Sequence, residues 1–355
     1  MPKSAREKVI LGAVFLVSFV VQLWLWFGPF PYTDVDLWTK AAQQFANGTW
    51  PGFSSPIPPH PGTTILLPAS GLVLLGVPAF VALQCTIAFL MSLAVVSIVY
   101  LCRILRPKSL WWLGVAVLLI PNPLYLEMTV PTALAALISC TYILLILYMY
   151  EKGITRETLF YTGICAGILL ATRLDTGVSV LLISIPFLWK LANKQLFLLL
   201  GTTTLFFGAL NPYIWEGPFM YAQSFLRQLG VNTTTDSGFG YSHNATILAF
   251  ISFALAFSVV YFRQQYSSLS REYLFWLVAG STALCAVIMF SKYHPIRYFF
   301  QLMTLWEVFL PLFVLDGINN LSRRLSEASQ YCARYIFILC ILGERLVSIY
   351  FLWRW

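Results

Sequence analysis

The stretch AFVALQCTIAFLMSLAVVSIVYLCRILRPK, residues 79–108, decides the fold class of this protein. Its first 24 residues, 79–102, carry no charge, and three basic residues follow directly at Arg103, Arg106 and Lys108. A helix needs about 20 apolar residues to cross a bilayer, and basic residues concentrate in loops on the cytoplasmic side. The stretch therefore predicts a membrane-spanning helix whose carboxyl end lies on the inner side.

The rest of the chain has the same apolar character. Of its 355 residues, 59% are hydrophobic and 10% are charged, whereas a soluble domain carries about 25% charged residues. Its mean hydropathy is +0.77. The predicted fold is all-α, with one polytopic membrane domain over residues 1–355. About eleven spans are predicted, at 9–29, 79–102, 110–121, 130–150, 157–172, 175–189, 195–212, 246–262, 273–290, 299–317 and 335–353.

A charge count orients these spans with the amino terminus in the cytoplasm. Counting 62–78 as a further span would place the basic segment 102–108 outside, which lysine and arginine disfavour. Residues 62–78 are therefore predicted to form an interfacial or re-entrant segment on the outer side. The long outer loops are 30–62 and 213–245, and inner loops are short. Of the 22 basic residues, 15 then lie inside: Lys3, Arg6, Lys8, Arg103, Arg106, Lys108, Lys152, Arg156, Lys190, Lys194, Arg263, Arg271, Arg323, Arg324 and Arg334.

The first outer loop contains the stretch PYTDVDLWTKAAQQFANGTW, residues 31–50, with two acids at Asp34 and Asp36. Apolar residues recur between Asp34 and Phe45 at the spacing of a short amphipathic helix on the membrane surface. A proline-rich segment follows and contains His60. A structural reading of the acids stays open, in which Asp34 caps this helix and Asp36 stabilises its positive end.

This loop resembles the GT-C superfamily of membrane glycosyltransferases, which includes protein O-mannosyltransferases and aminoarabinose transferases of lipid A. An acid follows the first span, the aromatic Trp38 comes four residues after Asp34, and the sequence PPHPGTTILL is similar to the family's His-Pro-Pro segment. YTDVD also looks like the Asp-x-Asp of the GPI mannosyltransferases. In this chain Gly62 stands in place of the second proline.

Three later segments resemble the same superfamily, in the same order. IPNPLYLEMTVPTALAALISCTYILL (120–145) is similar to the second outer loop and offers Glu127 as its acid. GICAGILLATRLDTGVSVLL (163–182) resembles a helical hairpin with a basic residue, Arg173, at its tip. SKYHPIRYFFQLMTLWEVFLPLF (291–313) resembles a late Arg-Tyr motif.

The resemblance implies that the enzyme moves a sugar from a polyprenyl-phosphate donor to an acceptor at the outer face. A carboxylate would take the proton of the acceptor hydroxyl as it attacks. Asp34 is the first candidate for this base and Asp36 the second, with Glu127 in support. No cofactor is implied with certainty, although Asp34 and Asp36 could hold a divalent metal ion through oxygen ligands.

Cations would stabilise the charge that develops on the leaving phosphate. The donor-phosphate-binding candidates are Arg297, Arg173, Lys292 and Tyr298, and the substrate-positioning candidates are His60 and Trp38. Other readings stay open. Arg297 and Lys292 could anchor the chain at lipid head groups, Arg173 could pair with Asp175, and His60 could make a structural hydrogen bond.

The expected partners are the sugar lipid, a glycan, lipid or protein acceptor, and the bilayer, with no nucleic acid. The expected location is the plasma membrane, with the endoplasmic reticulum left open as the alternative, and with the active site on the outer face. An alternative function is a transporter or flippase of lipid-linked sugars, which should place ionisable groups near the bilayer midplane. A polymerase or ligase of surface polysaccharide is a third reading. Glu307, Glu344 and Arg345 lie in predicted spans and receive no role.

Overall fold

A computed structural model describes residues 5–27, 35–49, 63–105 and 130–223, together with isolated positions between 328 and 346. Every regular element in these ranges is a helix, and they contain no strand. The predicted spans 110–121, 246–262, 273–290 and 299–317 lie outside the described residues, and only scattered positions of 335–353 are described.

Three of the described helices are long and apolar enough to cross a membrane. They are α1 (Ala5–Phe27), α4 (Ala79–Leu105) and α6 (Val130–Lys152). They match three predicted spans, 9–29, 79–102 and 130–150. The described part of the chain is therefore an α-helical bundle of membrane-protein character.

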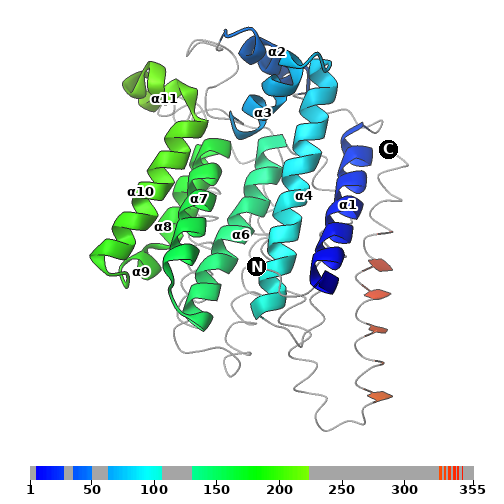
Figure 1. Cartoon of the computed structure of the whole chain (residues 1–355), viewed down its shortest axis with the longest axis vertical. Helices are drawn as coiled ribbons and strands as arrows, with labels where there is room; N and C mark the ends of the chain where they lie inside the picture. Colours follow the sequence, from blue (N-terminus) through cyan, green and yellow to red (C-terminus); the bar gives the residue numbers. More distant parts are fainter. Residues whose placement is uncertain are drawn as a thin grey trace, which may run out of the picture.

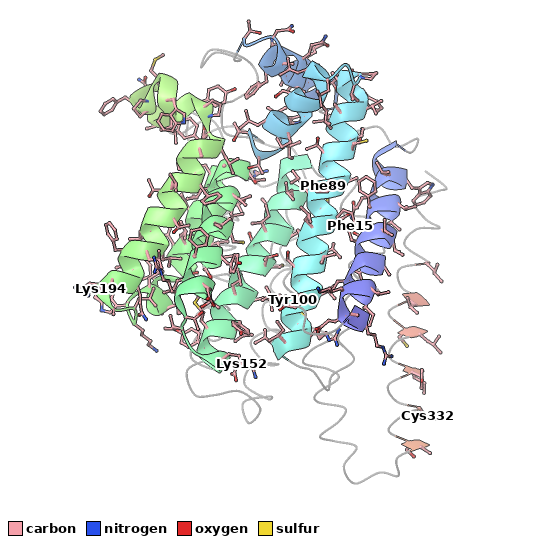
Figure 2. The ribbon with its side chains drawn as sticks, viewed as in Figure 1. Phe15, Phe89, Tyr100, Lys152, Lys194 and Cys332 are labelled. Atoms are coloured by element: carbon pink, nitrogen blue, oxygen red, sulfur yellow. The ribbon has the colours of Figure 1, made fainter. Side chains whose placement is uncertain are left out.

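The helices form a row in which each long helix packs on the next. Figure 1 shows α1, α4, α6, α7 and α10 in this order across the molecule, and each adjacent pair is in contact. Helix α1 contacts α4 through the rings of Phe15 and Phe89, whose centroids are 5.6 Å apart (Figure 2). At the amino end of α1, Arg103 Nη1 lies 3.3 Å from Glu7 Oε1. Helices α1 and α4 therefore run antiparallel.

The second half of the described chain forms α7 (Arg156–Thr172), α8 (Leu174–Ile183), α9 (Ile185–Leu188), α10 (Asn193–Leu210) and α11 (Pro212–Glu216). Helices α7 and α10 occupy the predicted spans 157–172 and 195–212. The predicted single span 175–189 is instead broken into α8 and α9 at Ser184. Pro186 has no backbone N–H to continue the helix, and the Ser184 hydroxyl donates to Val180 O at 2.8 Å. Helix α8 alone is about 15 Å long.

Helices α7 and α10 approach each other closely because two glycines face the contact. A Cβ on Gly163 would lie 2.7 Å from Thr202 Cβ, and one on Gly167 would lie 2.7 Å from both Phe206 Cβ and Thr203 O. Small residues four apart let two helix backbones pack tightly in a membrane. The two contacts have the same sequence offset, which is 39 residues in each case (202 − 163 and 206 − 167). Helices α7 and α10 are therefore parallel and in a fixed register.

The bundle has two ends of different composition. Helices α2 (Val35–Ala46), α3 (Thr63–Leu74) and α11 lie at one end, which we call the α2 end (Figure 1). The opposite end carries Arg103, Lys152, Arg156, Lys190 and Lys194, and we call it the basic end. Figure 2 labels Lys152 and Lys194 there.

Candidate functional site

Helix α2 carries Asp36 at the α2 end. Asp36 lies in the first turn of the helix and is exposed. Its carboxylate thus stabilises the positive end of the helix, as one reading of the sequence holds, and it is also open to a ligand. Asp34 lies outside the described residues. The predicted amphipathic helix is confirmed, with bounds one residue later at each end, but its apolar face lies against protein and not on a membrane surface.

The apolar face of α2 packs on protein. Trp38, Ala41, Ala42 and Phe45 are buried and follow the i, i+3, i+4, i+7 spacing of one helix face. Helix α2 contacts α3 and α4. Phe45 also meets Tyr213 of α11 edge to face, with ring centroids 6.1 Å apart. The position of Asp36 is therefore fixed by three neighbouring helices.

Trp38 is a member of this buried face rather than part of an open surface. It is 4% exposed, and its Nε1 has no hydrogen-bond partner among the described residues. A buried indole N–H usually finds such a partner. The structure gives Trp38 a clear packing role in holding α2. Its predicted role in positioning substrate stays a prediction.

The amino end of α3 is tied to the carboxyl end of α7 by threonine hydroxyls. Thr63 Oγ1 donates to Ala171 O at 2.9 Å, and Thr64 Oγ1 lies 3.0 Å from Thr172 Oγ1. Thr172 also lies 2.7 Å from Ile168 O. All three threonines are buried. Buried hydroxyls need such partners, because an unpaired one is costly. These contacts hold α3 against α7.

Arg173 occupies the junction between α7 and α8. It has extended backbone angles (φ −157°, ψ 107°), its N–H donates to Leu169 O, and its carbonyl accepts from Gly177 N. A single extended residue thus reverses the chain from α7 into α8. The side chain is only 8% exposed. Burial of an arginine is costly unless its guanidinium group is paired and hydrogen-bonded. Neighbouring groups at the α2 end must therefore stabilise the charge of Arg173. The side chain of Asp175, its alternative partner, is not among the described ones.

Asn211 lies at the matching junction between α10 and α11. It is 1% exposed, and its Oδ1 has no hydrogen-bond partner among the described residues. The offset between Arg173 and Asn211 is 38 residues (211 − 173), within one residue of the register that Gly163 and Gly167 set. Arg173 and Asn211 therefore lie at the same level, at the carboxyl ends of two packed parallel helices.

Sequence reasoning missed Asn211 and the threonines of α3 and α7. An asparagine directly before Pro212 is an ordinary helix-end signal, and threonines in apolar helices commonly bond to their own backbone. Their burial at one end of the bundle follows only from the packing of α3, α7 and α10. The threonine pair Thr63-Thr64, at the start of an otherwise apolar helix, was the one available signal.

The remaining predicted site residues lie outside the described residues: Asp34, Glu127, Arg297, Lys292, Tyr298 and His60. Within the described ranges, no group of three or more His, Cys, Asp and Glu side chains could hold a metal ion. A metal held by Asp34 and Asp36 therefore stays a prediction. Of the predicted set, the structure places Asp36, Trp38 and Arg173, and all three lie at the α2 end.

Searches of protein-family models, curated proteins and solved structures find no match for this chain.

Proposed function

We propose that this protein is a membrane glycosyltransferase that moves a sugar from a polyprenyl-phosphate donor to an acceptor hydroxyl. The observation that carries the proposal is the convergence of chemically active groups at the α2 end. Helix α2 with Asp36 packs on α3, and α3 is hydrogen-bonded to the last turn of α7 next to Arg173. An acid and a buried cation far apart in sequence thus share one end of an apolar bundle, where the head group of a membrane lipid would lie.

The proposed chemistry assigns a different role to each group. The Asp34 or Asp36 carboxylate accepts the proton of the acceptor hydroxyl, and the hydroxyl oxygen bonds to the anomeric carbon. The bond from that carbon to the phosphate oxygen breaks, and its electron pair leaves with the phosphate. Arg173 stabilises the developing negative charge. Trp38 acts indirectly, because it packs α2 on its neighbours and so sets the position of Asp36.

The predicted topology completes the proposal. With about eleven spans and a cytoplasmic amino terminus, the α2 end faces the periplasm, the extracellular space or a lumen. Glu127, Arg297, Lys292, Tyr298 and His60 belong to outer segments of the same topology. The bundle would then open its active site away from the cytoplasm, within reach of both the donor lipid and an external acceptor.

The test is sugar transfer by the purified full chain from a panel of synthetic polyprenyl-phospho-sugars. We expect Asp34→Asn or Asp36→Asn to lower the rate by about 10²-fold or more, as loss of a general base does. Arg173→Gln should lower the rate by about 10²–10³-fold, as loss of one stabilising donor does. Lys40→Gln is the matched control, since Lys40 is an exposed cation on the same helix as Asp36. It should stay within about twofold of wild type.

Two results would contradict the proposal. Full activity in both aspartate variants would remove the base assignment. Absence of transfer from every donor, together with movement of the sugar lipid across vesicles containing the protein, would support the transporter instead.

A further inference from the structure

The turn that ends helix α2 has the sequence Asn47-Gly48-Thr49, which matches the Asn-x-Ser/Thr signal for N-linked glycosylation. The helix lies at the α2 end of the bundle (Figure 1). A signal this short occurs often by chance. It marks an acceptor site only where the asparagine is at the surface and faces the compartment in which the modification takes place. The structure bears on both conditions.

Asn47 points away from the protein on which α2 packs. Its backbone N–H donates to Gln43 O at 3.0 Å, so the residue continues the helical rotation of about 100° per residue. That rotation places Asn47 opposite the buried face of α2, to which Trp38 and Phe45 belong. Asn47 is exposed. The first condition is therefore met.

The geometry of the turn accounts for Gly48 but not for Asn47. Gly48 has a left-handed φ of +70°, and its N–H donates to Phe45 O at 3.1 Å. Thr49 N donates to Gln44 O at 2.9 Å, and Thr49 Oγ1 donates to the same oxygen at 3.0 Å. A helix end of this kind needs a glycine, but no particular side chain at the position before it. The fold thus does not require the asparagine that the signal requires.

The surroundings of the turn leave room for a glycan. A Cβ on Gly48 would meet nothing within 4 Å, and both Gly48 and Thr49 are exposed. Asp36 lies eleven residues earlier in the same helix (47 − 36), which is about 16 Å along the helix axis. A glycan on Asn47 would therefore be attached at the far end of α2 from Asp36.

The cations at the opposite end of the bundle indicate which side Asn47 faces. Arg103 and Lys152 lie in the last turns of α4 and α6, at the basic end. Basic residues concentrate on the cytoplasmic side of a membrane protein, so the basic end is predicted to face the cytoplasm. Asn47 then lies on the outer side, where N-linked glycans are attached. The second condition follows from this predicted orientation.

We propose that Asn47 is an acceptor site for N-linked glycosylation on the outer side of the membrane. The donor is an oligosaccharide carried on a polyprenyl diphosphate. Asn47 Nδ2 bonds to the anomeric carbon of the oligosaccharide and loses one proton. The bond from that carbon to the phosphate oxygen breaks, and its electron pair leaves with the lipid diphosphate. Asn47 is the substrate of a host enzyme in this step, so the inference does not rest on the proposed glycosyltransferase activity.

The test is synthesis of the full chain with microsomal membranes that contain the N-glycosylation machinery, followed by peptide mass spectrometry. Enzymatic removal of the glycan in heavy-oxygen water converts each modified asparagine to a labelled aspartate. We expect the label at Asn47 in the wild type. Thr49→Ser should keep the label, because it keeps the hydroxyl that the signal requires. Thr49→Val has nearly the same shape without the hydroxyl and should lose the label.

A matched control places the same signal at the basic end. Gln195→Thr completes it at Asn193, which is exposed in the first turn of α10. We expect no label at Asn193, because the basic end is predicted to face the cytoplasm. An unlabelled Asn47 in the wild type would overturn the proposal, as would equal labelling of Asn193 and Asn47. Asn47→Gln should keep the wild-type rate of sugar transfer, so the label and the transfer rate are separate measurements.

Discussion

The α2 end and the basic end hold their polar groups in opposite ways. At the basic end, the cations Lys152, Arg156 and Lys194 are exposed and can reach water or lipid head groups. At the α2 end, Arg173 and Asn211 are buried between helices. An exposed cation costs little free energy, whereas a buried charge or an unpaired buried polar atom is costly. The α2 end therefore buries a cation and an amide between its helices, whereas the three cations named at the basic end face outward.

The burial of Arg173 and Asn211 at one level depends on the register of α7 and α10. Gly167→Leu should disrupt this register. The new side chain would meet Thr203 O and Phe206 Cβ, each 2.7 Å from the position of a Cβ. A backbone carbonyl cannot move aside as the end of a side chain can. We expect destabilisation of at least about 1–3 kcal/mol, the usual cost of overpacking, and a lower melting temperature for the purified protein. Arg173 and Asn211 should then no longer lie at the same level of the bundle.

The control for this change is Gly201→Leu on α10, where a Cβ would meet nothing within 4 Å. It should leave the melting temperature unchanged or slightly raised, because glycine is a poor helix former. An equal loss of stability in both variants would show that close packing at Gly167 is not the cause.

The buried amide of Asn211 gives a second and smaller test. Asn211→Leu removes a polar atom that has no partner among the described residues and replaces it with a side chain of similar size. If the amide serves function rather than stability, the melting temperature should be unchanged or higher. The free energy of unfolding should then rise by up to about 1–2 kcal/mol. Sugar transfer should fall in the same variant. A clear drop in melting temperature would instead assign Asn211 a structural role.

The smallest effect is expected at the basic end. Glu7→Gln removes one partner of the contact with Arg103, in which the two atoms are 3.3 Å apart and both side chains are partly exposed. Ion pairs of this kind contribute about 0–1 kcal/mol, so the melting temperature should change little. High salt should reduce whatever difference is found. A loss as large as that of Gly167→Leu would contradict the contrast between the two ends.

Apolar periodicity and charge predicted the described helices well. Helices α1, α4 and α6 match the predicted spans within a few residues, because blocks of uncharged residues end at charged or proline-rich segments. The spacing of Trp38 and Phe45 predicted α2 for a similar reason. The break at Ser184 was missed, since a proline inside an apolar block can either kink a membrane helix or end it.

The candidate site was predictable only in part. Asp36 and Arg173 stand out in the sequence as charges beside apolar runs, and their proposed roles rest on a resemblance that no comparison tests. The burial of Trp38 depends on which neighbours cover α2, and an amphipathic pattern is the same for a helix on a membrane and a helix on protein. Arg173 and Asn211 lie at the same level because Gly163 and Gly167 of α7 pack against α10. The pattern of residues in α10 alone does not reveal that contact.

Local composition was enough to predict that this protein is helical and membrane-like, where α1, α2, α4 and α6 run, and which end of the bundle is basic. Those properties follow from local composition, because a span needs a long uncharged block and basic residues lie at its ends. The convergence of α2, α3, α7 and α10, and the burial of Arg173 and Asn211 at one level, follow only from tertiary packing. Burial and register depend on contacts between distant segments, which no local pattern encodes.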